Sequence, residues 1–375
     1  MPFTLPRFTP PDFSRPPLSN APPVRTRMAT EKGLAPEDFH ATSNHPEYVR
    51  LASDEWVLVP ESRMDCVLVL RGNGLEAIEP RRINKGDEVV VGRTENGEEG
   101  IFVHTEGFPE PGGNIQDKFA FRTRGTRETS FSRSYDTLYE ILRHDREQGN
   151  IVWVLGPAVA FDKDSRQAMQ GLIEAGYCHA LLAGNALATH DLEAALFQTG
   201  LGQDIYSQAP IRNGHYHHLD ILNIVRSHGS IRKAIRDQRI DNGIMYTCDK
   251  HDVPYVLAGS IRDDGPLPEV IANVYEAQDA MRSYVKKATT VIAMATQLHS
   301  IAVGNMTPSY KVMEGGMVRP VFFYIVDISE FSVDKLANRG STQTTAVVTN
   351  VQDFIVNLWR NLMLSSREPA MEQAS

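Results

Sequence analysis

Ile151-Val152-Trp153-Val154-Leu155-Gly156-Pro157 is the stretch of sequence that decides the fold. Its five apolar residues follow one another without alternation, and they end at Gly-Pro. Such a run is typical of a strand that is covered on both faces, as in a parallel sheet. The same pattern then recurs along the chain, each time with a small or polar residue directly after the run. The further runs are residues 180–183, 256–258, 291–295, 321–326 and 346–348.

Segments with helical periodicity separate these runs. A helix is predicted near residues 135–148, and the last one, at residues 351–362, has apolar residues at i, i+3, i+4 and i+7. Alternating strands and helices form βαβ units. The sequence therefore predicts an α/β fold, with a Rossmann-like, mostly parallel sheet domain over residues 135–365. In such sheets ligands bind at the carboxyl ends of the strands, so the residues after each run are candidate site residues.

The N-terminal part of the chain has a different pattern. Short strands separated by Gly and Asn predict a small, mostly antiparallel β domain over residues 45–134. Residues 1–44 are predicted to form a Pro-rich arm, because eight of the 22 prolines lie in the first 23 residues. Such an arm is either a disordered tail or a segment that docks on a neighbouring subunit, and we expect removal of residues 1–25 to leave the fold intact. Residues 366–375 are predicted to be a tail.

Two turns in the β domain were interpreted from their residues. Gly72-Asn73-Gly74-Leu75-Glu76-Ala77 matches G-x-G-x-x-A and follows a strand. A dinucleotide fingerprint needs a helix immediately afterwards, and Pro80 with a second strand region follows instead, so we interpret these residues as a hairpin turn. Residues 88–92 and 100–104 bracket Asn96-Gly97, which predicts a second hairpin.

Composition excludes several classes of protein. The net charge of −9 over 375 residues argues against a protein that coats nucleic acid. No apolar run approaches the roughly 20 residues needed to span a bilayer, and no signal peptide is recognisable. Three widely spaced cysteines exclude a disulfide scaffold and a four-cysteine zinc site. We expect a cytoplasmic protein with neither membrane nor nucleic-acid partners.

Polar residues at the strand ends are candidates for nucleotide binding. Asp327 follows a strand and either accepts hydrogen bonds from a ribose diol or caps a helix with Leu336 on it and a stop at Gly340. Gly184-Asn185 and Gly259-Ser260 let the backbone approach a phosphate at a helix N-terminus.

A histidine cluster spans Gly214-His215-Tyr216-His217-His218. Its i, i+2, i+3 spacing does not place three ligands on one helix face, so no metal site is predicted there. Structural histidines or one acid–base histidine remain, and His215 is our candidate for the latter. Lys250 is either a base or a surface charge, and Cys248 is typical of a small buried residue.

The loop of residues 259–268 carries Arg262, Asp263 and Asp264 directly after a predicted buried strand. These charges either close a solvated turn or recognise an amino acid. In the second case Arg262 would bind the carboxylate, and Asp263 or Asp264 would bind an amine.

The sequence resembles the LOR/SDH-domain family, which includes archaeal NAD-dependent ornithine cyclodeaminases and the C-terminal part of cyanobacterial bifunctional arginine-dihydrolase proteins. The resemblance covers roughly residues 45–360. It is carried by Leu182-Ala183-Gly184-Asn185-Ala186-Leu187-Ala188, Gly214-His215-Tyr216-His217-His218-Leu219, Gly243-Ile244-Met245-Tyr246, Val256-Leu257-Ala258-Gly259-Ser260-Ile261-Arg262-Asp263-Asp264-Gly265-Pro266-Leu267-Pro268 and His299-Ser300-Ile301-Ala302-Val303-Gly304-Asn305-Met306.

The resemblance implies a small β domain followed by a Rossmann-like domain that binds NAD. We expect His215, Lys250, Asp263 and Asp264 to be catalytic, Arg262 and Asn305 to bind the substrate, and no metal to be held. The residues expected at the cofactor are Asn185, Ala186, Cys248, Gly259, Ser260, Ile261, Thr296, His299 and Asp327. A small amino-acid substrate and a homo-oligomer are expected.

The implied function is an NAD-dependent cyclodeaminase that converts ornithine or a similar diamino acid to a cyclic imino acid of the proline type. The α-amine is oxidised to an imine, the distal amine attacks it, ammonia leaves, and the cyclic imine takes the hydride back. Three alternatives stay open: an opine- or saccharopine-type NAD oxidoreductase on a secondary amine, a non-catalytic NAD-binding regulatory protein, and a metal-dependent hydrolase. Asp327 favours NAD over NADP, because its charge would repel a 2′-phosphate.

Overall fold

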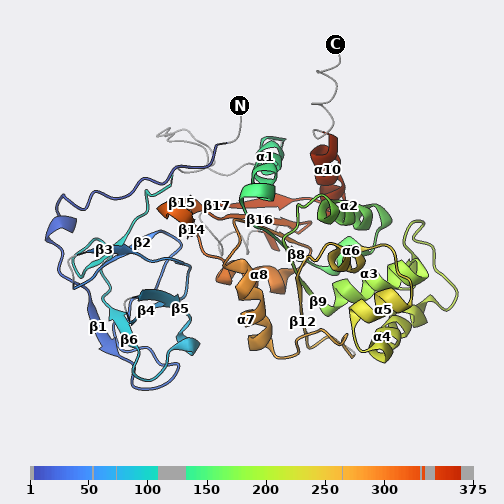
Figure 1. Cartoon of the computed structure of the whole chain (residues 1–375), viewed down its shortest axis with the longest axis horizontal. Coiled ribbons are helices and arrows are strands. Elements are labelled where there is room, and N and C mark those ends of the chain that lie inside the picture. The colour runs from blue at the N-terminus through green and yellow to red at the C-terminus, as the bar shows by residue number, and fades with distance from the viewer. Residues whose placement is uncertain are drawn as a thin grey trace, which may run out of the picture.

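A six-stranded parallel sheet forms the centre of the molecule (Figure 1). The structure is a computed structural model that describes residues 4–52, 55–72, 74–108, 132–263, 265–329, 332–333 and 343–364. The strands of the sheet are β8 (Ile151–Leu155), β9 (Ala180–Gly184), β12 (Tyr255–Ala258), β13 (Thr290–Met294), β16 (Phe322–Asp327) and β17 (Gln343–Val348). Each predicted apolar run is a strand, and the predicted fold class is confirmed.

The strand order is β12-β9-β8-β13-β16-β17, and every neighbouring pair is parallel. From β8 the chain steps outward through β9 to β12, and it then returns to the other side of β8 to build β13, β16 and β17. This is the doubly wound order in which the direction of winding reverses between the first and fourth strands. The switch point therefore lies between the carboxyl ends of β8 and β13.

Helices cover both faces of this sheet, which explains why its strands are apolar on both sides. Ile151, Trp153 and Leu155 pack into one core, whereas Val152 and Val154 pack into the other. On the first face lie α1 (Ser132–Gln148), α2 (Lys163–Glu174), α3 (Asn185–Phe197), α6 (Ile244–Lys250) and α10 (Val351–Leu364). On the second lie α7 (Val274–Val285) and α8 (Gln297–Met306), between the sheet and the small β domain (Figure 1). No helix of the described residues is long and apolar enough to cross a bilayer.

Shorter elements complete this domain. The helices α4 (His217–His228) and α5 (Ile231–Asp237) pack on each other beyond α3. Two antiparallel strand pairs are β10 (Thr199–Gly200) with β11 (Gln203–Asp204), and β14 (Tyr310–Val312) with β15 (Val318–Pro320).

The N-terminal domain holds two antiparallel sheets, of order β1-β6-β4-β5 and β3-β2-β7. Its strands are β1 (Arg25–Met28), β2 (Glu47–Arg50), β3 (Trp56–Leu58), β4 (Val67–Arg71), β5 (Gly74–Ile78), β6 (Glu88–Val91) and β7 (Ile101–Val103). Arg71 pairs with Gly74, so the G-x-G-x-x-A match is the predicted hairpin. The second predicted hairpin is wrong, because β6 and β7 belong to different sheets.

The Pro-rich N-terminus packs on its own chain. The strand β1 pairs with β6 along its whole length, so residues 25–28 belong to the sheet of the small domain. The ring of Phe13 stacks on Trp56 at 5.0 Å between centroids, and the N–H of Thr9 donates to the carbonyl of Gly107 at 2.9 Å. The expectation of a detached arm is therefore corrected: aromatic side chains between the prolines anchor it to the β domain.

Candidate active site at the carboxyl edge of the sheet

Gly156 marks the switch point. A Cβ atom at this position would lie 1.8 Å from the carbonyl oxygen of Ala295, the residue after β13. The N–H of Gly156 donates to the carbonyl of Met294 at 2.8 Å, and Ala295 has a φ of 56°. A non-glycine residue in the left-handed region is uncommon and is often found at functional sites. The two loops thus meet backbone to backbone, which leaves the carboxyl edge bare of side chains at this point.

Two helix N-termini come together beside this point. The helix α3 begins after Gly184 and α8 begins after Thr296, and neither N-cap side chain accepts a hydrogen bond from the first turn. A Cβ atom on Gly184 would lie 2.8 Å from Cε1 of His299, so the imidazole rests directly against this glycine. Free N–H groups and the helix dipole make such N-termini suited to phosphate groups.

His299 is the ionisable side chain at this junction. Its Nδ1 lies 3.3 Å from Oγ1 of Thr296, and the ring is largely buried. Burial lowers the pKa of His299, and the charge of Asp263 opposes this shift only in part. The imidazole is therefore neutral near pH 7 and is able to accept a proton.

The charged loop follows β12. The carboxylate of Asp263 accepts the N–H of Ser260 at 2.8 Å, while Arg262 and Ile261 are exposed to solvent. A Cβ atom on Gly259 would lie 3.1 Å from the carbonyl oxygen of Ile271, so the loop starts close to the returning chain. Asp263 therefore closes a turn, which is the first of the two roles that the sequence suggests for this loop. Asp264 lies outside the described residues.

Asn185 is buried at the start of α3. Its Oδ1 accepts the N–H of Leu267 at 3.0 Å, which ties this helix to the end of the charged loop. The side-chain oxygen is thus occupied within the protein, and what this segment offers to a ligand is its backbone N–H groups, including that of Ala186.

Asp327 ends β16, two strands away from β8. Its Oδ1 accepts the N–H of Ser329 at 2.9 Å. In most doubly wound dinucleotide folds the acidic residue follows the second strand, where this chain has Gly184 and Asn185. The helix expected after Asp327, with Leu336 and Gly340, lies outside the described residues.

Two predicted residues, Cys248 and Lys250, are not brought to this edge. Lys250 and Cys248 lie on α6, which leads into the amino end of β12. Cys248 is in the core, and burial raises the pKa of its thiol well above the ordinary value. His215 is exposed beside Tyr216, with 4.2 Å between the ring centroids, and Asn305 lies near the C-terminal end of α8.

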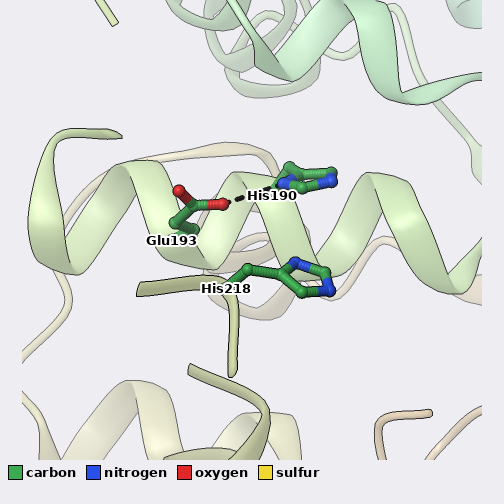
Figure 2. A group of neighbouring side chains, drawn as sticks. All are labelled: His190, Glu193 and His218. Carbon is green, nitrogen blue, oxygen red and sulfur yellow. Dashed lines mark hydrogen bonds and ion pairs between the residues drawn. The ribbon is translucent and has the colours of Figure 1, made fainter. Parts of the chain in front are cut away.

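The structure assembles one group that the sequence interpretation missed (Figure 2). His190 and Glu193 point from α3 toward His218 on α4, and the three side chains offer ligand atoms that all lie within 4.8 Å of one another. The i, i+3 spacing of His190 and Glu193 was the available signal. This spacing alone does not include His218, which reaches the pair only through the packing of α4 on α3.

The comparisons with known proteins agree with the Rossmann-like fold. The family model for the C-terminal Rossmann fold of arginine dihydrolase ArgZ-like proteins matches residues 137–358. A protein of Methanopyrus kandleri named ornithine cyclodeaminase is 40% identical over 90% of this chain and 78% of its own length. One of the same name from Methanothermobacter thermautotrophicus is 42% identical, over 88% and 76% respectively.

Solved structures extend the likeness to three dimensions. A LOR/SDH protein from Methanococcus maripaludis has a TM-score of 0.82 at 36% identity, covering 92% of this chain and 99% of that one. The complex of AgrE with ornithine and NAD+ has a TM-score of 0.58 at 32% identity, covering 94% of this chain and 47% of that one. The bifunctional cyanobacterial ArgZ of Synechocystis is 38% identical over 92% of this chain. The match spans about half of the length of ArgZ.

The fold and the relatives together define a Rossmann-type enzyme of amino-acid metabolism. The chain belongs to the ArgZ-like family, in which the archaeal relatives carry the name ornithine cyclodeaminase. The predicted family and the prediction of an enzyme of this type are confirmed.

Proposed function

We propose that this chain is an NAD-dependent ornithine cyclodeaminase that converts ornithine to proline with release of ammonia. The observation that carries the proposal is the junction of Gly184 with His299, where two helix N-termini and a neutral imidazole meet beside the switch point. The archaeal relatives support the choice of reaction, and the ligands of the AgrE complex support the choice of ornithine and NAD.

The residues present fit a dinucleotide. Gly156 lets the loops after β8 and β13 pack together at the switch point, and the uncapped first turns of α3 and α8 would supply N–H donors for a pyrophosphate. Asn185, Ala186, Gly259, Ser260, Thr296 and His299 would line it, and Asp327 would accept hydrogen bonds from a ribose on its half of the sheet. When bound, NAD supplies acceptance and return of a hydride.

The chain's own side chains would handle the substrate. His299 would take the proton that the α-ammonium group must lose before oxidation, which its lowered pKa permits. The carboxylate of Asp263 would attract the distal ammonium, and the exposed guanidinium of Arg262 would bind the substrate carboxylate. Asp264 stays an alternative to Asp263.

The test is incubation of the full chain with NAD and, separately, ornithine, lysine, arginine and a secondary amino acid, with ammonia, proline and NADH followed together. We expect one ammonia and one proline per ornithine consumed, without net NADH. Stoichiometric NADH formation would instead indicate the opine- or saccharopine-type reaction. Binding of NAD without turnover of any of these amino acids would leave only the regulatory alternative.

A further inference from the structure

His190, Glu193 and His218 form a compact group of side chains beyond the first turn of α3 (Figure 2). Nδ1 of His190 lies 2.8 Å from Oε2 of Glu193, and the rings of His190 and His218 stack with 5.0 Å between their centroids. Glu193 has no exposed surface and His190 is 6% exposed, whereas His218 is partly exposed on the α4 side of the group.

We propose that these three side chains bind one divalent transition-metal ion of the Zn²⁺ class. Two imidazoles and one carboxylate are a common ligand set for Zn²⁺ and for other first-row ions, whereas Mg²⁺ and Ca²⁺ prefer oxygen ligands alone. Tetrahedral bonds of about 2.0–2.2 Å hold the ligand atoms about 3.4 Å apart. The pair at 2.8 Å would therefore open slightly, and the wider spacings, which are at most 4.8 Å, would close. Side-chain rotation supplies a movement of that size.

The surroundings of Glu193 are those of an oriented metal ligand. The hydroxyl of Thr199 donates to its Oε1 at 3.0 Å, the N–H of Gly202 approaches the same oxygen at 3.4 Å, and Nδ1 of His217 lies 2.9 Å from the Thr199 hydroxyl. Partners of this kind fix the position of a metal-bound carboxylate. The edge of Phe161 packs against His190 and closes the group on another side.

The charge balance of this group differs from that of two other buried carboxylates and matches that of Glu47, which pairs with His40. Asp145 pairs with Arg319 and Asp191 pairs with Arg166, so a permanent cation compensates each of them. Among the described residues Glu193 pairs with the imidazole of His190, and a bound divalent cation would add a permanent positive charge beside this carboxylate.

The ion would link α3 to α4. Because α3 starts at the carboxyl edge, such a link would also stabilise the helix whose first turn faces the proposed cofactor. The metal proposal itself does not depend on the proposed reaction, since it rests on the three side chains and their shell.

The experiment measures metal binding by the full chain directly. Protein dialysed against a chelator is titrated with Zn²⁺ by calorimetry, its metal content is then determined by mass spectrometry, and Co²⁺ is added in place of Zn²⁺ for the visible spectrum. We expect one Zn²⁺ per chain, d–d absorption of low-coordinate Co²⁺, and a rise of about 2–5 °C in melting temperature with excess Zn²⁺. His218→Gln should weaken the Zn²⁺ affinity at least about tenfold, because it removes one of three ligands.

Two matched controls separate this site from general histidine binding. His215→Gln removes a nearby exposed histidine, and His40→Gln removes the histidine of a buried pair with Glu47 at 2.9 Å. Both should keep one Zn²⁺ at unchanged affinity. Less than half an equivalent of Zn²⁺ on the unaltered chain, or equal affinity in folded His218→Gln, would overturn the proposal. The titration of the unaltered chain decides the question even where a variant fails to fold.

Discussion

His299 is neutral because of what surrounds it. Burial against Gly184 lowers its pKa, and Asp263 is too weakly coupled to restore it. We expect His299→Gln to lower kcat about 10²-fold or more, the usual contribution of a general base, with intact folding. Steady-state ammonia release checks this, with His251→Gln, at an exposed histidine outside the proposed site, as the control that keeps full activity.

The same residue gives a pH dependence. A base must be unprotonated to act, and the pKa of His299 lies below its ordinary value of 6.5. We therefore expect kcat/KM to stay constant down to about pH 6.5 and to decrease at lower pH. Since the unfolded chain takes up this proton at a higher pH than the folded chain, the free energy of unfolding should also decrease as the pH falls below about 6.5. An acidic limb that is unchanged in His299→Gln would assign it to another group.

Asp263 allows its two roles to be separated. Asp263→Asn keeps an oxygen that can accept the N–H of Ser260 but removes the charge. If the residue binds the distal ammonium, kcat/KM for ornithine should fall about 10- to 100-fold, the loss of a charge-assisted hydrogen bond, while NAD affinity is unchanged. Full activity in Asp263→Asn, together with lowered stability in Asp263→Ala, would leave the carboxylate with the turn alone.

At the scale of elements, the close contact between the start of α3 and the start of α8 positions the site. Gly184→Ala is compatible with its backbone at φ −102°, yet the added methyl group would meet the His299 ring at 2.8 Å. We expect kcat and NAD affinity to fall about tenfold, and the overpacking to cost about 1–3 kcal/mol of stability. Gly74→Ala is the matched control, because its added atom would be 3.5 Å from the carbonyl of Arg71. This variant should leave kcat, NAD affinity and stability unchanged. Normal NAD affinity in Gly184→Ala would mean that the imidazole moves aside freely.

The N-terminal segment yields a second prediction at this scale. Deleting residues 1–23 removes the stack of Phe13 on Trp56 and the contact of Leu5 with the main core. We expect a fall of several degrees in melting temperature, of which Phe13→Ala reproduces a part, because buried aromatic area is lost. If the melting temperature of the shortened chain lay within about 1 °C of that of the full chain, the arm would not contribute to stability, as its composition predicts.

For the whole molecule, an ion-pair group joins the two domains. Glu79 of the small domain contacts Arg63 at 2.9 Å and Arg282 of α7, and the two arginines are 3% and 4% exposed. Burial alone would raise the pKa of Glu79, but the two guanidinium groups outweigh it and hold the pKa below its ordinary value. The stability that this carboxylate contributes is therefore present above about pH 4.5 and is lost as the pH falls below that value.

Glu79→Gln should strongly destabilise the chain, because it leaves two buried cations without their carboxylate. We expect a loss of about 3–5 kcal/mol in the free energy of unfolding, measured by urea denaturation. Glu76→Gln, which breaks an ion pair between Glu76 and Arg71 on the surface, should cost less than about 1 kcal/mol. Equal losses of unfolding free energy in both variants would show that the ion-pair group of Glu79 does not stabilise the contact between the two domains.

The sequence by itself determined the six parallel strands, the helices between them and the edge at which the site lies. Local sequence patterns are sufficient to predict those features, because a strand buried on both faces needs a continuous apolar run such as Ile151–Leu155. The hairpin at Arg71 and Gly74 is equally local, since the residues of the turn decide it.

Only the tertiary structure decided which residues meet. Gly184 touches His299, and His190 faces His218, because strand order and helix packing bring together segments that are far apart in the chain. Lys250 was placed in the site for its chemistry alone, yet α6 carries it toward the amino end of β12. The residue type determines the chemistry of which a side chain is capable. Its position in the molecule depends on long-range packing, which no local sequence pattern encodes.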